Sequence, residues 1–331
     1  MQQIFIRVLT EHRIKPLYPF YKKNNSGLFS ELYIQNTSPN PSFATVSFKA
    51  TTGSSCQVNY SISGKGLIRI NIADISCVGS TFIGAAFITA SEPIAVTATQ
   101  FRLNSNQRPE IFMESQYASN VRHTVYAPLY QNYNNGFISA SMLQNSSNST
   151  SLITLQFKDG TGATCGSLHS FPNVSPYFSA LDSVLPGSSC NTIPSAIISS
   201  AYPIAATVNQ VRQNTLINAS YPAIAYPGKK VIIPVWFNQY NTWLSGVTVQ
   251  NLDTIYQFVN ITFYYPDGSY FTNVWSPNLA PNQNYTFINI PSGSFRGSAV
   301  LSSAGPIVAV VDHTVSGTTQ DQFASQSGVH R

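Results

Sequence analysis

The side chains of this sequence that could do chemistry are few and scattered. The five histidines are His12, His123, His169, His313 and His330, and only 12 residues are Asp or Glu. No HExxH, GxSxG, GxGxxG or P-loop pattern accompanies them. Glycoside hydrolysis needs two facing carboxylates and calcium binding needs several clustered ones. The acidic residues offer neither pattern, so we expect no enzyme, no cofactor and no metal site; only His313 beside Asp312 stays open as a functional pair.

Four cysteines stand at repeated positions. Cys56 and Cys165 each follow an equivalent glutamine by 21 residues, and their candidate partners are Cys77 and Cys190. Four cysteines allow three pairings, and the repeat described below selects Cys56 with Cys77 and Cys165 with Cys190. A third copy carries Phe271 at the matching position and no cysteine at all. Because both members of the pair are absent together, we expect disulfides, and hence an oxidising compartment, rather than buried thiols or metal ligands.

Two further sets of residues are candidates for sugar chemistry. Nine Asn-x-Ser/Thr sequons are glycosylation candidates: Asn24, Asn36, Asn59, Asn145, Asn148, Asn173, Asn218, Asn260 and Asn284. Aromatic clusters follow the first proline of each copy: Tyr18, Phe20 and Tyr21; Tyr130 and Tyr133; Trp236, Phe237 and Tyr240. They could form a sugar-binding platform, but their recurrence favours packing at the junctions. Trp243 and Trp275 lack counterparts, so they are the candidate ligand aromatics.

These residues are positioned by a repeat, the main feature of the sequence. Each copy has a first proline, then a Gln-Asn pair that ends an alternating strand, then a closing Pro-Ile-Ala or Pro-Ile-Val. The anchors are Pro16, Pro128 and Pro234; Gln35-Asn36, Gln144-Asn145 and Gln250-Asn251; Pro93, Pro203 and Pro306. The glutamines lie 109 and 106 residues apart. Three ordered anchors at one period predict one folding unit written three times.

Within each copy the pattern is that of short antiparallel strands. Apolar alternating segments end in turns such as Asp159-Gly160 and Asp267-Gly268, a strong hairpin signal. Apolar residues make up 43% of the chain, and no long helical pattern occurs. We therefore predict an all-β protein of three tandem Ig-like antiparallel β-sandwich domains in an elongated array. The predicted parts are an N-terminal extension at 1–13 and repeats at 14–120, 121–226 and 227–331.

The quoted motifs resemble a repeat of large secreted and surface proteins of bacteria such as Chloroflexi and of some archaea. In that repeat a strand ending in VQN leads to an FxDGxG hairpin, an LPPG-like turn and a closing SDQPVAAVVNQ. The second copy, with FKDGTG, LPGSS and YPIAATVNQV, is the most similar. The first copy lacks the Asp-Gly, and the third has Val311-Asp312-His313 in place of Thr-Gln or Asn-Gln. The resemblance implies an extracellular structural or display role and no activity.

The charge pattern excludes some partners. Charged residues are 9% of the chain, and the net charge of +5 is spread without a basic cluster. Nucleic-acid binding needs such a cluster, so we expect none. No segment approaches the roughly 20 apolar residues of a membrane span.

We therefore expect an extracellular or cell-surface structural protein that polymerises head to tail as a filament, stalk or surface layer. A strand formed by Ile4, Phe5, Ile6, Val8 and Leu9 would pair with the edge of a neighbouring subunit. Two alternatives stay open, an adhesin or carbohydrate-binding module and a fragment of a larger surface protein. The expected partners are accordingly copies of the chain, other surface proteins or glycans.

Overall fold

The computed structural model describes residues 17–23, 28–103, 109–114, 121–183, 185–213, 218–315 and 323–330. Regular structure in this part of the chain is antiparallel β, with two short 3-10 helices. The predicted all-β sandwich fold is confirmed. The boundaries of the three predicted domains stay a prediction, and the term repeat is used below for the three sequence ranges.

The first repeat contains two four-stranded sheets, with strand orders β1-β6-β3-β4 and β5-β2-β7-β8. The strands are β1 (Leu17–Lys23), β2 (Leu28–Asn36), β3 (Ser42–Ala50), β4 (Ser55–Ile62), β5 (Leu67–Asn71), β6 (Phe82–Ala90), β7 (Ile94–Leu103) and β8 (Pro109–Glu114). The 3-10 helices η1 (Ile72–Asp74) and η2 (Ser76–Val78) lie between β5 and β6.

The second repeat has the same arrangement, with one strand running through both sheets. Its strands are β9 (Arg122–Ala127), β10 (Asn132–Asn134), β11 (Phe137–Asn145), β12 (Ser151–Lys158), β13 (Thr164–Val174), β14 (Ser179–Asp182), β15 (Ser195–Arg212) and β16 (Asn218–Pro222). The first half of β15 pairs with β9 and β12, and its second half pairs with β11 and β16. Strand β15 therefore replaces both β6 and β7.

The third repeat follows this second plan. Its strands are β17 (Gly228–Asn238), β18 (Trp243–Asn251), β19 (Val259–Tyr264), β20 (Tyr270–Trp275), β21 (Asn284–Ile288), β22 (Phe295–Val315), β23 (Phe323–Ser327) and β24 (Val329–His330). The long strand β22 pairs with β17 and β19 in its first half and with β18 and β23 in its second half.

The core is divided into three hydrophobic clusters, one within residues 32–98, one mainly within 125–225 and one within 231–311. Equivalent phenylalanines Phe48, Phe157 and Phe263 belong to these clusters. Each lies twelve residues after the asparagine of its Gln-Asn pair and is at most 1% exposed. A strand with alternating apolar residues buries one face, so a buried phenylalanine stands at the same position of this strand in each repeat. Val310 of β22 packs in the second cluster and links two repeats.

Strand register aligns the copies residue by residue and corrects one anchor. Tyr18, Ala127 and Ile233 pair with equivalent alanines of β6, β15 and β22. The proline that follows is Pro19 in the first repeat, so Pro19 rather than Pro16 is the counterpart of Pro128 and Pro234. Sequence spacing missed this because a proline happens to stand at both positions.

Glycine occupies the equivalent positions 84 and 297 because a side chain does not fit at either of them. A Cβ added to Gly84 would collide with the carbonyl oxygen of Lys49, and one added to Gly297 would collide with that of Tyr264. Lys49 and Tyr264 are themselves equivalent. Glycine is thus required where β6 and β22 pass close to the neighbouring strands β3 and β19.

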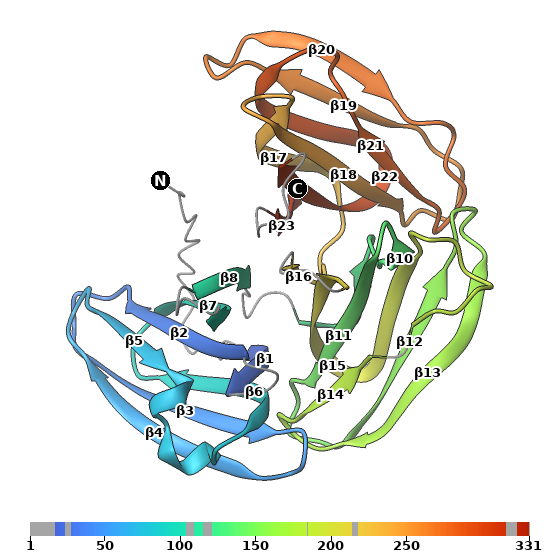
Figure 1. Cartoon of the computed structure of the whole chain (residues 1–331). Helices are drawn as coiled ribbons and strands as arrows, with labels where there is room; N and C mark the ends of the chain where they lie inside the picture. The colour runs from blue at the N-terminus through green and yellow to red at the C-terminus, as the bar shows by residue number, and fades with distance from the viewer. Residues whose placement is uncertain are drawn as a thin grey trace.

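The repeats lie on a curve rather than along a straight axis. Figure 1 shows the three units around a common centre, where β8, β16 and β23 gather. Strand β16 contacts both β8 and β23, which brings the inner sides of successive repeats together. The predicted elongated array is therefore bent, because each junction is held both at the ends of the sandwiches and at this centre.

Candidate assembly interface

The asparagine of each Gln-Asn pair holds one end of its sandwich together. The side-chain nitrogens of Asn36, Asn145 and Asn251 donate to the carbonyl oxygen four residues on, at 2.6, 2.7 and 2.9 Å. Each also donates to the segment that leads into the next edge strand. Each side-chain oxygen accepts the backbone N–H two residues on. All three are fully buried, so this sequence signature is a structural lock.

Disulfides join Cys56 to Cys77 and Cys165 to Cys190, which are the pairs that the repeat predicts. The Cα atoms lie 5.9 and 5.2 Å apart, and each bond stays within its own repeat. In the third repeat Phe271 stands at the position of Cys165. Its ring stacks on Phe295 with centroids 5.1 Å apart, so an aromatic contact takes the place of the disulfide.

A residue with positive φ precedes the edge strand beside each Gln-Asn pair. Lys65, Tyr177 and Asn282 have φ of 59°, 64° and 63°. We call the end of the sandwich that carries this residue the head of the repeat. The heads consist of Gln35, Lys65, Gly66 and Leu67; Gln144, Tyr177, Phe178 and Ser179; Gln250, Asn282, Gln283 and Asn284.

The head of each later repeat lies on the same part of the repeat before it. We call this part the receiving surface, on the sheet that contains the first strand of the repeat. Its positions are Lys49, Ala85, Phe87 and Pro19; Lys158, Ser195, Ile197 and Pro128; Tyr264, Ser298, Val300 and Pro234.

At the first junction the contact is aromatic. Tyr177 of the second head stacks on Phe87, with ring centroids 4.4 Å apart. The ammonium of Lys49 lies 5.2 Å from the centre of the Phe178 ring, a cation–π distance. The hydrophobic and cation–π contacts hold the second repeat on the first.

At the second junction other positions of the same two surfaces form hydrogen bonds. The side-chain nitrogen of Asn284 donates to the carbonyl oxygens of Pro128 and Ile193, both at 3.0 Å. Gln250 donates to the hydroxyl of Ser195 at 2.8 Å. Gly162, with φ of 87°, lies so close to residues 281–283 that a Cβ there would collide with them. Buried amide contacts therefore fix the third repeat on the second.

A polar cluster, in which Gln131 and Gln210 are buried and Asp312 and Ser325 are partly covered, completes the second junction at the centre of the molecule. Gln210 donates to Asp312 at 3.1 Å and to the Ser325 hydroxyl at 2.8 Å, and it accepts from Gln131 at 2.8 Å. The Ser325 hydroxyl also donates to Asp312. Burial raises the pKa of Asp312 to about 7, although these hydrogen bonds act to lower it. At neutral pH and below, a proton therefore resides on this carboxyl for much of the time.

His313, left open as a functional residue, faces away from that cluster. Its Nδ1 lies 2.7 Å from the hydroxyl of Ser245, and its ring packs edge-on against Phe237. Burial lowers the pKa of His313 to about 4, so the imidazole is neutral at physiological pH. The structure does not bring Asp312 and His313 together as a pair, because adjacent strand residues point to opposite faces.

The other titratable residues form no reactive centre in the described ranges. His169 Nδ1 lies 2.8 Å from the buried Asp182, inside the second repeat. His123 is exposed. Across those ranges, three or more His, Cys, Asp or Glu residues nowhere gather where a metal ion could bind. His12 lies outside the described residues, as do the side chain of His330 and the predicted assembly strand Ile4, Phe5, Ile6, Val8 and Leu9.

The sequons divide by exposure. Asn59, Asn148 and Asn173 are exposed and accessible to a glycan. Four others are buried, namely Asn36, Asn145, Asn260 and Asn284. At Asn36, Asn145 and Asn284 the nitrogen that would carry the sugar already donates to backbone carbonyls, so the fold argues against these candidates. Asn24 and the side chain of Asn218 lie outside the described residues.

The aromatic residues also divide. Tyr130 and Trp236 are equivalent and fully buried in the cores of their own repeats, stacked edge-on against Phe157 and Phe263. The prediction that they pack at junctions is wrong, because the strand turns them inward. Trp243 is partly covered and lies 6.0 Å from Phe237 between ring centres. Trp275 is 61% exposed on the outer edge strand β20.

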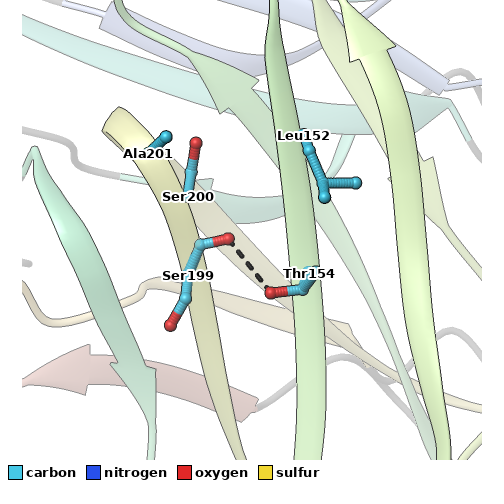
Figure 2. A pocket seen from close by; sticks show the side chains of 5 residues that line it. All are labelled: Leu152, Thr154, Ser199, Ser200 and Ala201. Atoms are coloured by element: carbon cyan, nitrogen blue, oxygen red, sulfur yellow. Dashed lines mark hydrogen bonds between the residues drawn. The ribbon is translucent and has the colours of Figure 1, made fainter.

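One open depression of about 250 Å³ lies on the outer face of the second repeat. Figure 2 shows its lining, in which the Thr154 hydroxyl donates to the carbonyl oxygen of Ser199 at 3.3 Å. The other lining residues are Leu152, Ser200 and Ala201. None of the five lining side chains titrates in the physiological range, so the depression offers no acid or base for catalysis. In the described part of the chain, no helix is both long and apolar enough to cross a bilayer.

Comparison with known proteins gives only distant structural similarities. No family model and no curated protein matches the chain, so the resemblance to the bacterial and archaeal surface repeat stays a prediction. The crystal structure of Thermotoga maritima 1070 is 15% identical with a TM-score of 0.27, over 31% of this chain and 95% of that one. A tetra-tandem repeat from the extending region of a large adhesion protein is 12% identical with a TM-score of 0.15, over 95% and 73%. The serine-rich repeat adhesion glycoprotein Srr1 from Streptococcus agalactiae is 11% identical with a TM-score of 0.17, over 64% and 97%.

Proposed function

We propose that this chain is an extracellular structural protein, the subunit of a cell-surface filament, stalk or layer that assembles head to tail. The observation that carries the proposal is the use of one contact twice, because the head of each later repeat lies on the receiving surface of the repeat before it. Such a contact joins two different surfaces of like units. One head and one receiving surface therefore stay unmatched, and further units can add to them.

The chemistry of the described residues supports an extracellular setting. Two disulfides occur in a chain with no free cysteine in the described residues, which is typical of an oxidising compartment. Solubility rests on neutral polar residues, since only 9% of the chain is charged. We propose no catalytic role.

Negative-stain microscopy of the purified full chain tests this function. We expect fibres, rings or sheets with a regular spacing, and each spacing should contain one chain. Isolated curved particles at every concentration, with no larger species in sedimentation velocity, would contradict the structural role.

A second function is favoured by one observation, the exposed indole of Trp275. Strand β20 lies at the edge of its sheet, where the indole of Trp275 presents an exposed aromatic face on which a sugar ring can stack. Glycan-array binding that is lost with Trp275→Ala and kept with the partly covered Trp243→Phe would support an adhesin. Equal array signals for these two variants and for the unmodified chain would contradict that function.

A further inference from the structure

The heads of the repeats differ sharply in exposure. At the equivalent first position of the edge strand, Ser179 is 6% exposed and Asn284 is 7% exposed, because both are covered by the preceding repeat. Leu67 occupies this position in the first repeat and is 61% exposed. The first head is thus an uncovered copy of a surface that the chain buries twice.

The receiving surfaces show the opposite asymmetry. Pro128 and Ser195 of the second repeat are buried under the third. Their counterparts are Pro234, which is exposed, and Ser298, which is partly exposed. Beside them the hairpin between β19 and β20 presents Tyr265, which is 41% exposed. The third repeat therefore carries an uncovered receiving surface with apolar character. Phe87 gives the receiving surface of the first repeat the same character.

Charges on the two uncovered ends are complementary. At the second junction the Gly162 hairpin lies against residues 281–283, which include Asn282. The equivalent of Asn282 on the free head is Lys65, and the equivalent of Gly162 is Gly268, which follows Asp267. Lys65 and Asp267 are both exposed. Hydrogen bonds from Ser269 hold the pKa of Asp267 below its ordinary value, so the carboxylate is charged.

We propose that the receiving surface of the third repeat binds the head of the first repeat of a second copy of this chain. The contact has the same geometry as the two internal junctions. Leu67 lies on the side of the receiving surface that carries Tyr265, and Lys65 lies opposite Asp267. This inference rests on the proposed function and names its partner and its interface. Figure 1 shows β5, at the free head, and β20, at the free receiving surface, on widely separated units, so a second chain supplies the partner.

Charge reversal gives a direct test. Lys65→Asp and Asp267→Lys each place like charges across the joint, and we expect each variant alone to assemble at least tenfold less in sedimentation velocity. When the two variants are mixed, the head of each carries the charge opposite to the hairpin of the other. Assembly should then return as an alternating copolymer. Recovery on mixing requires contact between chains, so it excludes closure of one chain on itself.

Controls keep the outcomes separate. Asp74→Lys changes an exposed charge on η1, away from both surfaces, and should leave assembly unchanged. Tryptophan fluorescence checks that each variant is folded in its third repeat, and Leu67→Arg provides a second block of the head at an exposed position. If the unmodified chain assembles but none of the three head and hairpin variants weakens it, this interface is wrong while the structural function stands.

Two other results would overturn the inference. Variants that fail singly and also fail when mixed would show that Lys65 and Asp267 do not face each other between chains. An unmodified chain that stays monomeric at all concentrations would remove both the interface and the structural function.

Discussion

At the scale of single residues, the most informative position is the asparagine that ends each Gln-Asn pair. Asn145 and Asn148 are both sequon asparagines and lie three residues apart, yet their environments are opposite. Asn145 is fully buried and its amide contacts the carbonyls of Ser149 and Val174, whereas Asn148 is exposed. Residue type and spacing alone do not separate a structural lock from a glycan acceptor.

We predict that Asn145→Ala lowers the free energy of unfolding of the second repeat by about 2 kcal/mol or more. The substitution leaves buried carbonyls without their donor, and that loss exceeds the value of an ordinary hydrogen bond. Asn148→Ala is the matched control and should change stability by less than about 0.5 kcal/mol, as is usual for exposed sites. Urea unfolding followed by circular dichroism measures both, and equal midpoints would contradict the lock.

At the scale of elements, the disulfide and its replacement separate the repeats. Cys165 of β13 and Cys190 close a segment of 25 residues, whereas the third repeat uses the Phe271–Phe295 stack. Cys165→Ala with Cys190→Ala should therefore lower the stability of the second repeat by roughly 3 kcal/mol. All three tryptophans of the chain, Trp236, Trp243 and Trp275, lie in the third repeat. Their fluorescence transition is the internal control and should move far less than the circular dichroism signal; a shift of equal size in both would contradict disulfide stabilisation confined to the second repeat.

The strand pattern and the disulfides could be predicted from sequence because both depend on local periodicity and on equivalence between copies. Alternating apolar residues indicated the strands, and equivalence between copies selected the cysteine pairs. The absence of both cysteines from the third copy favoured disulfides over free thiols. The inward turn of Tyr130 and Trp236 could not be predicted, since a strand presents either face until its register is known. The signature Asn-Gln of the closing segment became Asp312-His313 in the third copy, and only the fold shows that Asp312 faces Gln210.

The two junctions between repeats could not be predicted from the sequence either. A head and its receiving surface share no motif, because the first junction uses Phe87 and Tyr177 while the second uses Ser195 and Asn284. Different positions of the same two surfaces serve stacking at one junction and hydrogen bonding at the other. Only a backbone alignment by register, with Lys65, Tyr177 and Asn282 sharing a positive φ, reveals that the contact is one contact.

At the scale of the whole molecule, two neighbouring titratable groups of β22 have opposite effects, Asp312 at the second junction and His313 inside the third repeat. The folded pKa of Asp312 is about 7, against 3.8 for the free side chain, so the folded state holds the extra proton between these values. Its contribution to stability is therefore present at low pH and is lost as pH rises through about 7. His313, at about 4 against 6.5, contributes stability that is present above 6.5 and is lost as pH falls through about 4.

Between pH 4 and 6.5 these two contributions change in opposite directions and offset each other, so single substitutions should expose them. Relative to the unmodified chain, Asp312→Asn should gain stability as pH rises across this window, by up to about 1.4 kcal/mol per pH unit. Gln100 and Gln210 occupy the position of His313 in the first and second repeats. His313→Gln introduces the same residue, and the variant should lose stability over the same range relative to the unmodified chain. Tryptophan fluorescence of the third repeat measures both slopes. Parallel curves for the two variants would contradict the opposite titrations of Asp312 and His313, and the pH dependence of stability would then come from exposed charges.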